Sequence, residues 1–192
     1  MRRIILASQS PRRQELLHRI GLEPFDILVP QADESYDPAL PPQEIVAAIS
    51  AKKASAAAVL CESDALIIAA DTMVFLDDKR LGKPRDEAEA FAMLSALTGR
   101  EHLVCTGVTA RCGKQVWTEV ESTAVRFAPL TSAQIRWYIS TGECMDKAGA
   151  YGIQGRGALL VESIRGDYFN VMGLPVRRLS RMLTAFGVDL LA

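Results

Sequence analysis

The sequence has few cysteines, histidines and aromatic residues, and almost no net charge. Its 4 cysteines include no Cys-x-x-Cys pair, and with only 2 histidines there is no zinc-binding pattern, so we expect reduced, structural thiols. A net charge of −1 argues against broad electrostatic binding to nucleic acid or to a membrane surface. No apolar run approaches the roughly 20 residues of a membrane span, and the apolar start is too short for a signal peptide. We therefore expect a cytoplasmic protein.

What is present is an ordinary globular composition with alternating strand and helix patterns. At 192 residues and 49% hydrophobic content, the chain is long enough for a sizeable core. There is no internal repeat, low-complexity tract or linker. The pattern predicts an α/β fold over residues 1–192, a single domain with a mixed, twisted sheet flanked by helices.

The boundaries of helices and strands are predicted from the hydrophobic periodicity and from the residues that typically begin or end these elements. A strand that is apolar on both faces is predicted at 65–70, ending at Asp71-Thr72, and a further extended run covers 73–76. Two long extended segments, 102–111 and 115–127, predict a hairpin. Other strands are expected at 4–7, 25–29 and 158–164, and helices at 11–20, 42–60, 86–98, 131–141 and 175–186.

The turn between the first strand and the first helix carries an unusual charge pattern. Ser10 is the expected N-cap and Pro11 the first helical residue. Arg12 and Arg13 then place two cations at a helix N-terminus that already carries roughly +0.5 charge. A bound polyanion would reverse this penalty, since backbone N–H groups, the hydroxyls of Ser8 and Ser10 and two guanidinium groups form a phosphate site. Alternatively, both arginines point to solvent or pair with acids elsewhere.

Asp71 directly follows an apolar strand, so we expect it at that strand's carboxyl end, where open α/β sheets bind ligands. Burial there would raise its pKa toward the range of a general base. The alternative is a carboxylate that caps a turn. Asp33 and Glu34 lie in a long acidic loop, 30–42, and with Asp71 can supply oxygen ligands to Mg²⁺ or Mn²⁺. An acidic surface loop is the competing interpretation.

Two lysines and a glutamine complete the candidate residues. Lys53, on the second helix, and Lys83, between Gly82 and Pro84, can neutralise charge on a phosphoryl group, although each is also typical of a solvent-exposed surface. Gln154 lies in the glycine-rich segment 143–157, where its amide can donate to and accept from a nucleobase edge.

These segments stand in an order that resembles the Maf family of nucleoside triphosphate pyrophosphatases over nearly the whole chain. The matching segments are Ser8-Gln9-Ser10-Pro11-Arg12-Arg13, Asp33-Glu34, Lys53-Ala54, Ala70-Asp71-Thr72, Gly82-Lys83-Pro84, 146–155 (DKAGAYGIQG) and 170–175 (NVMGLP). The resemblance implies a Maf/ITPase-like fold with a deep nucleotide-binding cleft, and a homodimer.

The resemblance also implies hydrolysis of a nucleoside triphosphate between its α and β phosphates, giving the monophosphate and pyrophosphate with a divalent metal, Mg²⁺ or Mn²⁺. Asp71 matches the family's proton acceptor, and it shares the expected metal with Glu34. Residues matching the catalytic cleft are Glu34, Lys53 and Lys83. Residues matching the phosphate-binding turn are Ser8, Ser10, Arg12 and Arg13.

Base preference is implied by three further matches. Arg12, Thr72 and Gln154 are similar to the branch that favours dTTP and UTP, whereas the branch acting on 7-methyl-GTP differs there. We therefore expect pyrimidine triphosphates, including modified ones removed from the nucleotide pool. Alternatives are 7-methyl-GTP preference, a phosphatase that removes the terminal phosphate, and a nucleotide-binding regulator of septum formation and cell division.

Overall fold

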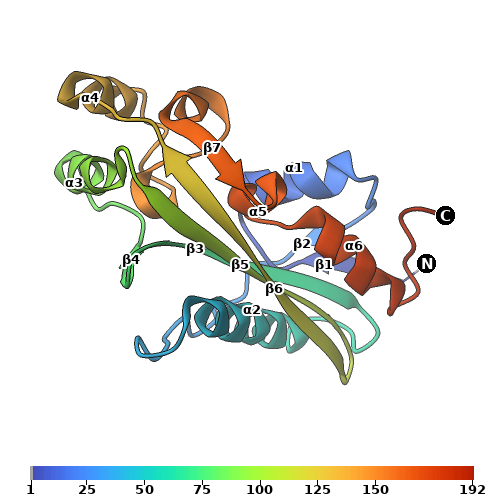
Figure 1. Ribbon diagram of the computed structural model, residues 1–192. Helices are drawn as coiled ribbons and strands as arrows, with labels where there is room; N and C mark the ends of the chain where they lie inside the picture. The colour runs from blue at the N-terminus through green and yellow to red at the C-terminus, as the bar shows by residue number, and fades with distance from the viewer. Residues whose placement is uncertain (1) are drawn as a thin grey trace. The chain divides into compact units, whose positions relative to one another are not determined.

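The computed structural model describes residues 2–192, which form a mixed seven-stranded sheet with helices packed against it (Figure 1). The strand order is β2-β1-β3-β5-β6-β7, with β4 paired to β3. The strands are β1 (Ile4–Leu6), β2 (Asp26–Ile27), β3 (Leu66–Leu76), β4 (Lys79–Leu81), β5 (Glu101–Cys112), β6 (Gln115–Phe127) and β7 (Val161–Arg165). The α-helices are α1 (Pro11–Arg19), α2 (Pro42–Ala58), α3 (Glu87–Leu97), α4 (Ser132–Ser140), α5 (Tyr168–Met172) and α6 (Val176–Thr184), and two 3₁₀ helices are η1 (Ala148–Ala150) and η2 (Gly155–Leu160). The predicted α/β class and mixed sheet are confirmed.

The chain divides into two compact units. Unit 1 comprises Met1–Asp71, Thr106–Glu121 and Gly173–Ala192, and unit 2 comprises Thr72–Cys105 and Ser122–Met172. The strands β3, β5 and β6 each contribute residues to both. A single domain over 1–192 stays a prediction.

In unit 1, α2 packs against the parallel pair β1 and β3. Ile5 of β1 pairs with Ile67 of β3, and alternation along β3 puts Ile67 and Ala69 on one face. These side chains form a buried cluster with Ala54 and Ala57 of α2. The small side chains of Ala54 and Ala57 let α2 lie close to the sheet. This packing also positions the neighbouring residues of α2.

Strand β5 approaches α2 closely at Gly107. A Cβ at this position would lie 2.2 Å from the carbonyl oxygen of Val46 in α2, closer than any real carbon contact. Glycine is therefore required here for steric reasons, because only a residue without a side chain lets the strand and the helix backbone meet.

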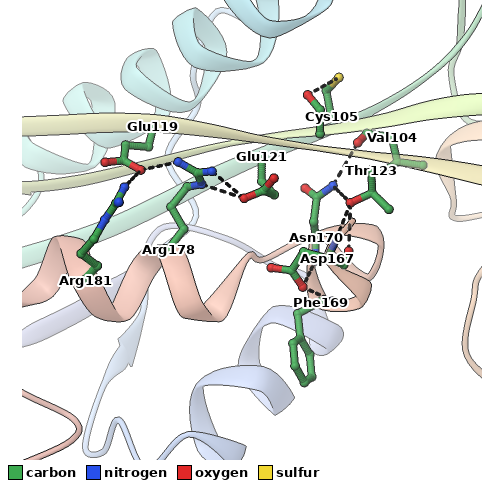
Figure 2. Close-up of polar contacts among 11 residues, drawn as sticks. Val104, Cys105, Glu119, Glu121, Thr123, Asp167, Phe169, Asn170, Arg178 and Arg181 are labelled. Atoms are coloured by element: carbon green, nitrogen blue, oxygen red, sulfur yellow. Dashed lines mark hydrogen bonds and ion pairs between the residues drawn. The ribbon is translucent and has the colours of Figure 1, made fainter. Parts of the chain in front are cut away.

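Two polar clusters secure the C-terminal helices on β6 (Figure 2). In unit 1, Arg178 of α6 donates to Glu119 and Glu121 of β6 at 2.6 Å each. In unit 2, the buried Asn170 of α5 donates to Thr123 Oγ1 at 2.9 Å. The same amide donates to the backbone oxygen of Val104 at 3.0 Å. The chain on both sides of Gly173, which joins α5 to α6, is thus held by buried or half-buried polar contacts.

Unit 2 has its own core between the helices α3 and α4 and the sheet, built around buried residues such as Leu94, Phe127 and Tyr138. Its helix starts agree with the sequence signals. Asp86 accepts from Glu89 N at 2.8 Å, and Thr131 and Gln134 form a complete capping box. The hairpin of β5 and β6 is also confirmed, with Gly113 at φ 57° in its turn.

The expected break at Asp71 is wrong, because β3 runs without interruption from Leu66 to Leu76. Its second half is extended by β4, which the sequence did not reveal and which pairs Val74 with Leu81. The tight turn before β4 uses Asp77 at φ 52°. Two other predictions need correction: the strand at 25–29 is reduced to Asp26–Ile27, and the strand at 158–164 starts at Val161 because η2 occupies the preceding residues.

The 4 cysteines, all within residues 2–192, are free thiols, as expected. Across the same described range, no helix combines the length and the apolar character needed to cross a membrane.

Candidate active site

The turn 8–13 joins β1 to α1 and is built as the sequence predicts. Ser10 is the N-cap, with its hydroxyl accepting from Arg13 N at 3.5 Å, and Pro11 opens the helix. The hydroxyl of Ser8 accepts from Ser10 N at 3.2 Å and from Arg13 Nη1 at 3.1 Å. Both serine hydroxyls therefore shape the turn that would meet a phosphate.

Arg13 points inward and not to solvent. Its Nε donates to the carbonyl oxygen of Gly173 at 2.8 Å, while Nη1 holds Ser8. Burial lowers the pKa of Arg13, and the charge of Asp71 opposes that shift, whereas the neighbouring Arg12 reinforces it. The half-buried guanidinium groups of Arg12 and Arg13 thus lie near one another and near the carboxylate of Asp71. This arrangement suits a polyanion that binds together with a cation.

Asp71 is placed by the alternation of β3. It lies on the same face as Ile67 and Ala69, toward α2, and therefore meets Lys53, the residue before Ala54. Lys53 Nζ lies 2.6 Å from Asp71 Oδ1, with both side chains largely buried (16% and 10% exposed). The same Nζ lies 3.0 Å from Glu34 Oε1, on a side chain that is 57% exposed. The structure thus brings Glu34, Lys53 and Asp71 into one cluster.

The two carboxylate oxygens of Asp71 differ in their surroundings. Oδ2 is buried and accepts no hydrogen bond within the part of the chain that the structure describes. A buried carboxylate oxygen left without a donor is costly and in native proteins points to a ligand or a reacting group. Because Asp71 lies three residues beyond Ile68, the last partner of β1, it does sit past the carboxyl end of that parallel strand. The alternative of a turn-capping carboxylate is excluded by the continuous β3.

Asp33 and Glu34 have separate roles. The Asp33 carboxylate accepts from Ser35 N at 2.8 Å and from Ser35 Oγ at 2.6 Å, and Lys52 Nζ lies 3.2 Å away. Hydrogen bonds from Ser35, with help from Lys52, lower the pKa of Asp33 to about 2. Lys52 also donates to Ser35 O at 2.7 Å. Asp33 therefore fastens the acidic loop to α2, and Glu34 is the acid that reaches the Asp71 cluster.

The donor set fits a metal that binds together with a phosphate. Among residues 2–192, no group of three or more histidine, cysteine or acidic side chains is placed to hold an ion. Glu34 and Asp71 offer two carboxylates on either side of the Lys53 ammonium, and Oδ2 of Asp71 has no hydrogen-bond partner in the described range 2–192. Mg²⁺ and Mn²⁺ usually take one or two carboxylates and complete their coordination with water and substrate phosphates.

Three predicted residues belong to unit 2. Thr72 follows Asp71 in β3 and points to the opposite face. Lys83 is exposed in the loop after β4. Gln154 is half-buried and precedes η2. The two loops are tied together, because Gly149 N donates to Gly82 O at 3.0 Å.

Comparison with known proteins identifies the family. The sequence model described as Maf-like protein matches residues 3–186. The chain belongs to the Maf family. A relative from Symbiobacterium thermophilum named dTTP/UTP pyrophosphatase is 52% identical over 97% of this chain and 95% of its own length. Another of that name from Moorella thermoacetica is 51% identical over 98% and 97%. A solved nucleoside-triphosphatase / dITP/XTP pyrophosphatase from Mycobacterium abscessus covers 96% of this chain and 98% of its own, at 13% identity and a TM-score of 0.45.

The sequence did not predict the backbone group that orients Arg13 in this Maf protein. The carbonyl oxygen of Gly173, at φ 108°, orients Arg13. A backbone acceptor has no residue-type signature, although the glycine in the segment 170–175 was a usable signal for unusual backbone geometry.

Proposed function

We propose that this protein hydrolyses nucleoside triphosphates, preferentially dTTP and UTP, between the α and β phosphates to give the monophosphate and pyrophosphate. Support comes from membership of the Maf family and from relatives named dTTP/UTP pyrophosphatase at 51–52% identity over nearly the full length. The observation that carries the proposal is the buried carboxylate of Asp71, with Oδ1 fixed by Lys53 and Oδ2 without a partner among the described residues.

In this proposal Asp71 accepts the proton of the attacking water. Its Oδ2 is available for that hydrogen bond, while the contact with Lys53 Nζ holds the carboxylate in one orientation. Glu34 and Asp71 would hold the metal, which when bound would polarise the substrate's phosphate oxygens and offset their charge. No covalent nucleophile is needed, because phosphoryl transfer is catalysed mainly by positioning and charge stabilisation.

The remaining candidate residues bind the substrate in this proposal. Arg13 is held inward by Gly173 and Ser8, so its guanidinium is positioned before a phosphate arrives. Lys83 offsets negative charge at the phosphates. The other binding residues are Ser8, Ser10 and Arg12 at the phosphates and Arg12, Thr72 and Gln154 for the choice of base.

The proposal has a cellular part that rests on the family resemblance. The protein would be a cytoplasmic homodimer. It would bind its nucleotide substrate and would bind neither nucleic acid nor a membrane. Its task would be removal of unwanted or modified pyrimidine triphosphates from the nucleotide pool. Size-exclusion chromatography with light scattering tests the dimer directly.

A triphosphate panel with product identification tests the reaction. Purified protein is incubated with dTTP, UTP, CTP, ATP, GTP and 7-methyl-GTP with Mg²⁺, Mn²⁺ or EDTA, and products are separated by ion-exchange chromatography. We expect monophosphate and pyrophosphate in equal amounts, fastest from dTTP and UTP, and no turnover with EDTA. Orthophosphate with diphosphate would indicate a terminal phosphatase. Much faster cleavage of 7-methyl-GTP would overturn the base preference, and tight binding without turnover would favour the regulator.

A further inference from the structure

The segment that carries Gln154 is anchored on both sides of that residue. Two positions before it, Gly152 N donates to the hydroxyl oxygen of Tyr138 at 3.2 Å. Two and three positions after it, Arg156 N and Gly157 N donate to the carboxylate of Glu143 at 3.1 and 3.3 Å. The side chain that would read the base therefore stands between two fixed points of backbone.

The glycines of this segment allow it to wrap closely around Glu143. A Cβ at Gly155, which has φ 62°, would lie 3.0 Å from the Glu143 carboxylate. A Cβ at Gly157 would lie 2.0 Å from the carbonyl oxygen of Gly152. Glycine is favoured at 155 by its positive φ, and at 157 a side chain would displace the backbone of Gly152. The loop and the carboxylate form one closely packed structure.

The two anchors are themselves fixed. Tyr138 of α4 is fully buried, and burial raises the pKa of its phenol to about 12, so the group stays neutral. Glu143 follows α4 and is held by its backbone: Glu143 N donates to Thr141 Oγ1 at 3.3 Å, and Lys147 Nζ donates to Glu143 O. The anchors thus transmit the position of the buried face of α4 to the loop.

We propose that Glu143 and Tyr138 are positioning residues that hold Gln154 for base selection in this protein. Neither residue needs to touch the nucleotide. This inference rests on the proposed function, because it gives Gln154 the task of reading a pyrimidine. An amide that must donate and accept hydrogen bonds at once can discriminate between bases only while its backbone is held in place. Loosening either anchor would therefore reduce the selectivity for the base.

A double-mutant cycle separates this role from general support of the fold. Glu143→Ala, Glu143→Gln and Tyr138→Phe are made in the natural sequence and in a Gln154→Ala background, and kcat and KM are measured for UTP, dTTP and 7-methyl-GTP. Glu162→Ala, which removes an exposed carboxylate of the same unit, is the matched control. Circular dichroism and thermal unfolding report whether each variant is folded.

We expect Glu143→Ala to narrow the preference for UTP over 7-methyl-GTP by about tenfold, mainly through a higher KM for UTP, as expected for loss of charged acceptor contacts. Tyr138→Phe and Glu143→Gln should act in the same direction by smaller factors. In the Gln154→Ala background the same changes should have no further effect on the preference, because the residue through which they act is gone.

Equal losses for all substrates, or an unchanged effect in the Gln154→Ala background, would overturn the positioning role while leaving the proposed function intact. Should Glu143→Ala fail to fold, Glu143→Gln and Tyr138→Phe decide the question by the same comparison. Absence of triphosphate cleavage by the natural protein would overturn the proposed function, and the inference with it.

Discussion

Oδ1 of Asp71 accepts a hydrogen bond from Nζ of Lys53 at 2.6 Å, while Oδ2 of the same carboxylate is buried without a partner among residues 2–192. One oxygen is therefore oriented and the other is left for a ligand. Lys53 also contacts Glu34, so a single ammonium group balances two carboxylates. A divalent cation and a triphosphate would therefore bind where Glu34 and Asp71 are already paired with Lys53.

Replacing Asp71 by asparagine keeps the shape of the side chain and removes the proposed general base. We expect Asp71→Asn to lower kcat for pyrophosphate release by roughly 10²–10⁴-fold, the usual contribution of a general base. Binding of dTTP should be largely retained, because the guanidinium and hydroxyl groups of the turn 8–13 are unchanged. Lys53 keeps Glu34 as a partner, so the variant should fold. Coupled pyrophosphate assays and isothermal titration calorimetry measure the two quantities.

The matched control is Asp78→Asn, at an exposed position in the turn that follows β3. It changes the net charge by the same amount and should leave turnover unchanged. If Asp71→Asn released pyrophosphate at the natural rate, Asp71 would not be the base.

The neighbouring acids Asp33 and Glu34 should respond differently. Glu34→Gln removes a candidate ligand beside Lys53, and we expect the Mg²⁺ concentration for half-maximal rate to rise by about tenfold, since affinity follows ligand charge. Asp33→Asn should change it less than about twofold, because asparagine can still accept from Ser35 N in the same turn.

Rates measured across a magnesium titration give both values, and Mn²⁺ binding followed by electron paramagnetic resonance provides a readout independent of turnover. A larger effect at Asp33 than at Glu34 would contradict the roles that the contacts of these two residues indicate.

Much of this arrangement was predictable from sequence because its signals are local. The N-caps at Ser10 and Thr131 lie next to the helices they start, and Asp71 stood out as a charge at the end of an apolar run. What could not be predicted depends on partners distant in the chain. The continuity of β3 is set by β4, and the inward turn of Arg13 by the carbonyl of Gly173.

The separation of Asp33 from Glu34 shows the same limit. As a sequence, the two acids are equivalent members of one loop. Lys52 and Lys53, both on α2, point to different acids, and each acid takes its role from the lysine that it contacts. Residue type defined the available chemistry, and only the packing of loop on helix assigned it.

Gly107 tests the close approach of β5 to α2. We expect Gly107→Ala to lower the free energy of unfolding by about 3 kcal/mol or more, since its Cβ would lie 2.2 Å from Val46 O and backbone must move. Gly82→Ala is the control, because a Cβ there meets nothing within 4 Å, and it should change stability by less than about 0.5 kcal/mol. Urea denaturation followed by circular dichroism measures both. Equal midpoints for the two variants would show that the approach of β5 to α2 is looser than described.

The buried His102 makes stability depend on pH. Its Nε2 lies 2.7 Å from the hydroxyl of Tyr151, its Nδ1 has no partner within residues 2–192, and burial lowers its pKa to about 4 from the ordinary 6.5. Above pH 6.5 the ring is neutral in both the folded and the unfolded chain, so its full contribution is present. As the pH falls toward 4, only the unfolded chain gains a proton, and stability declines by about 1.4 kcal/mol per pH unit, or roughly 3 kcal/mol across the range.

This slope is measured from urea denaturation at pH 7, 6, 5 and 4.5 on the natural protein and on His102→Gln, which retains a polar group but does not titrate. Carboxylates contribute equally to both proteins, so the difference between the two curves isolates the histidine. We expect that difference to change by about 2 to 3 kcal/mol between pH 7 and pH 4.5, with the natural protein losing more. Parallel curves for the natural protein and His102→Gln would mean that His102 takes up its proton as readily in the folded chain as in the unfolded one.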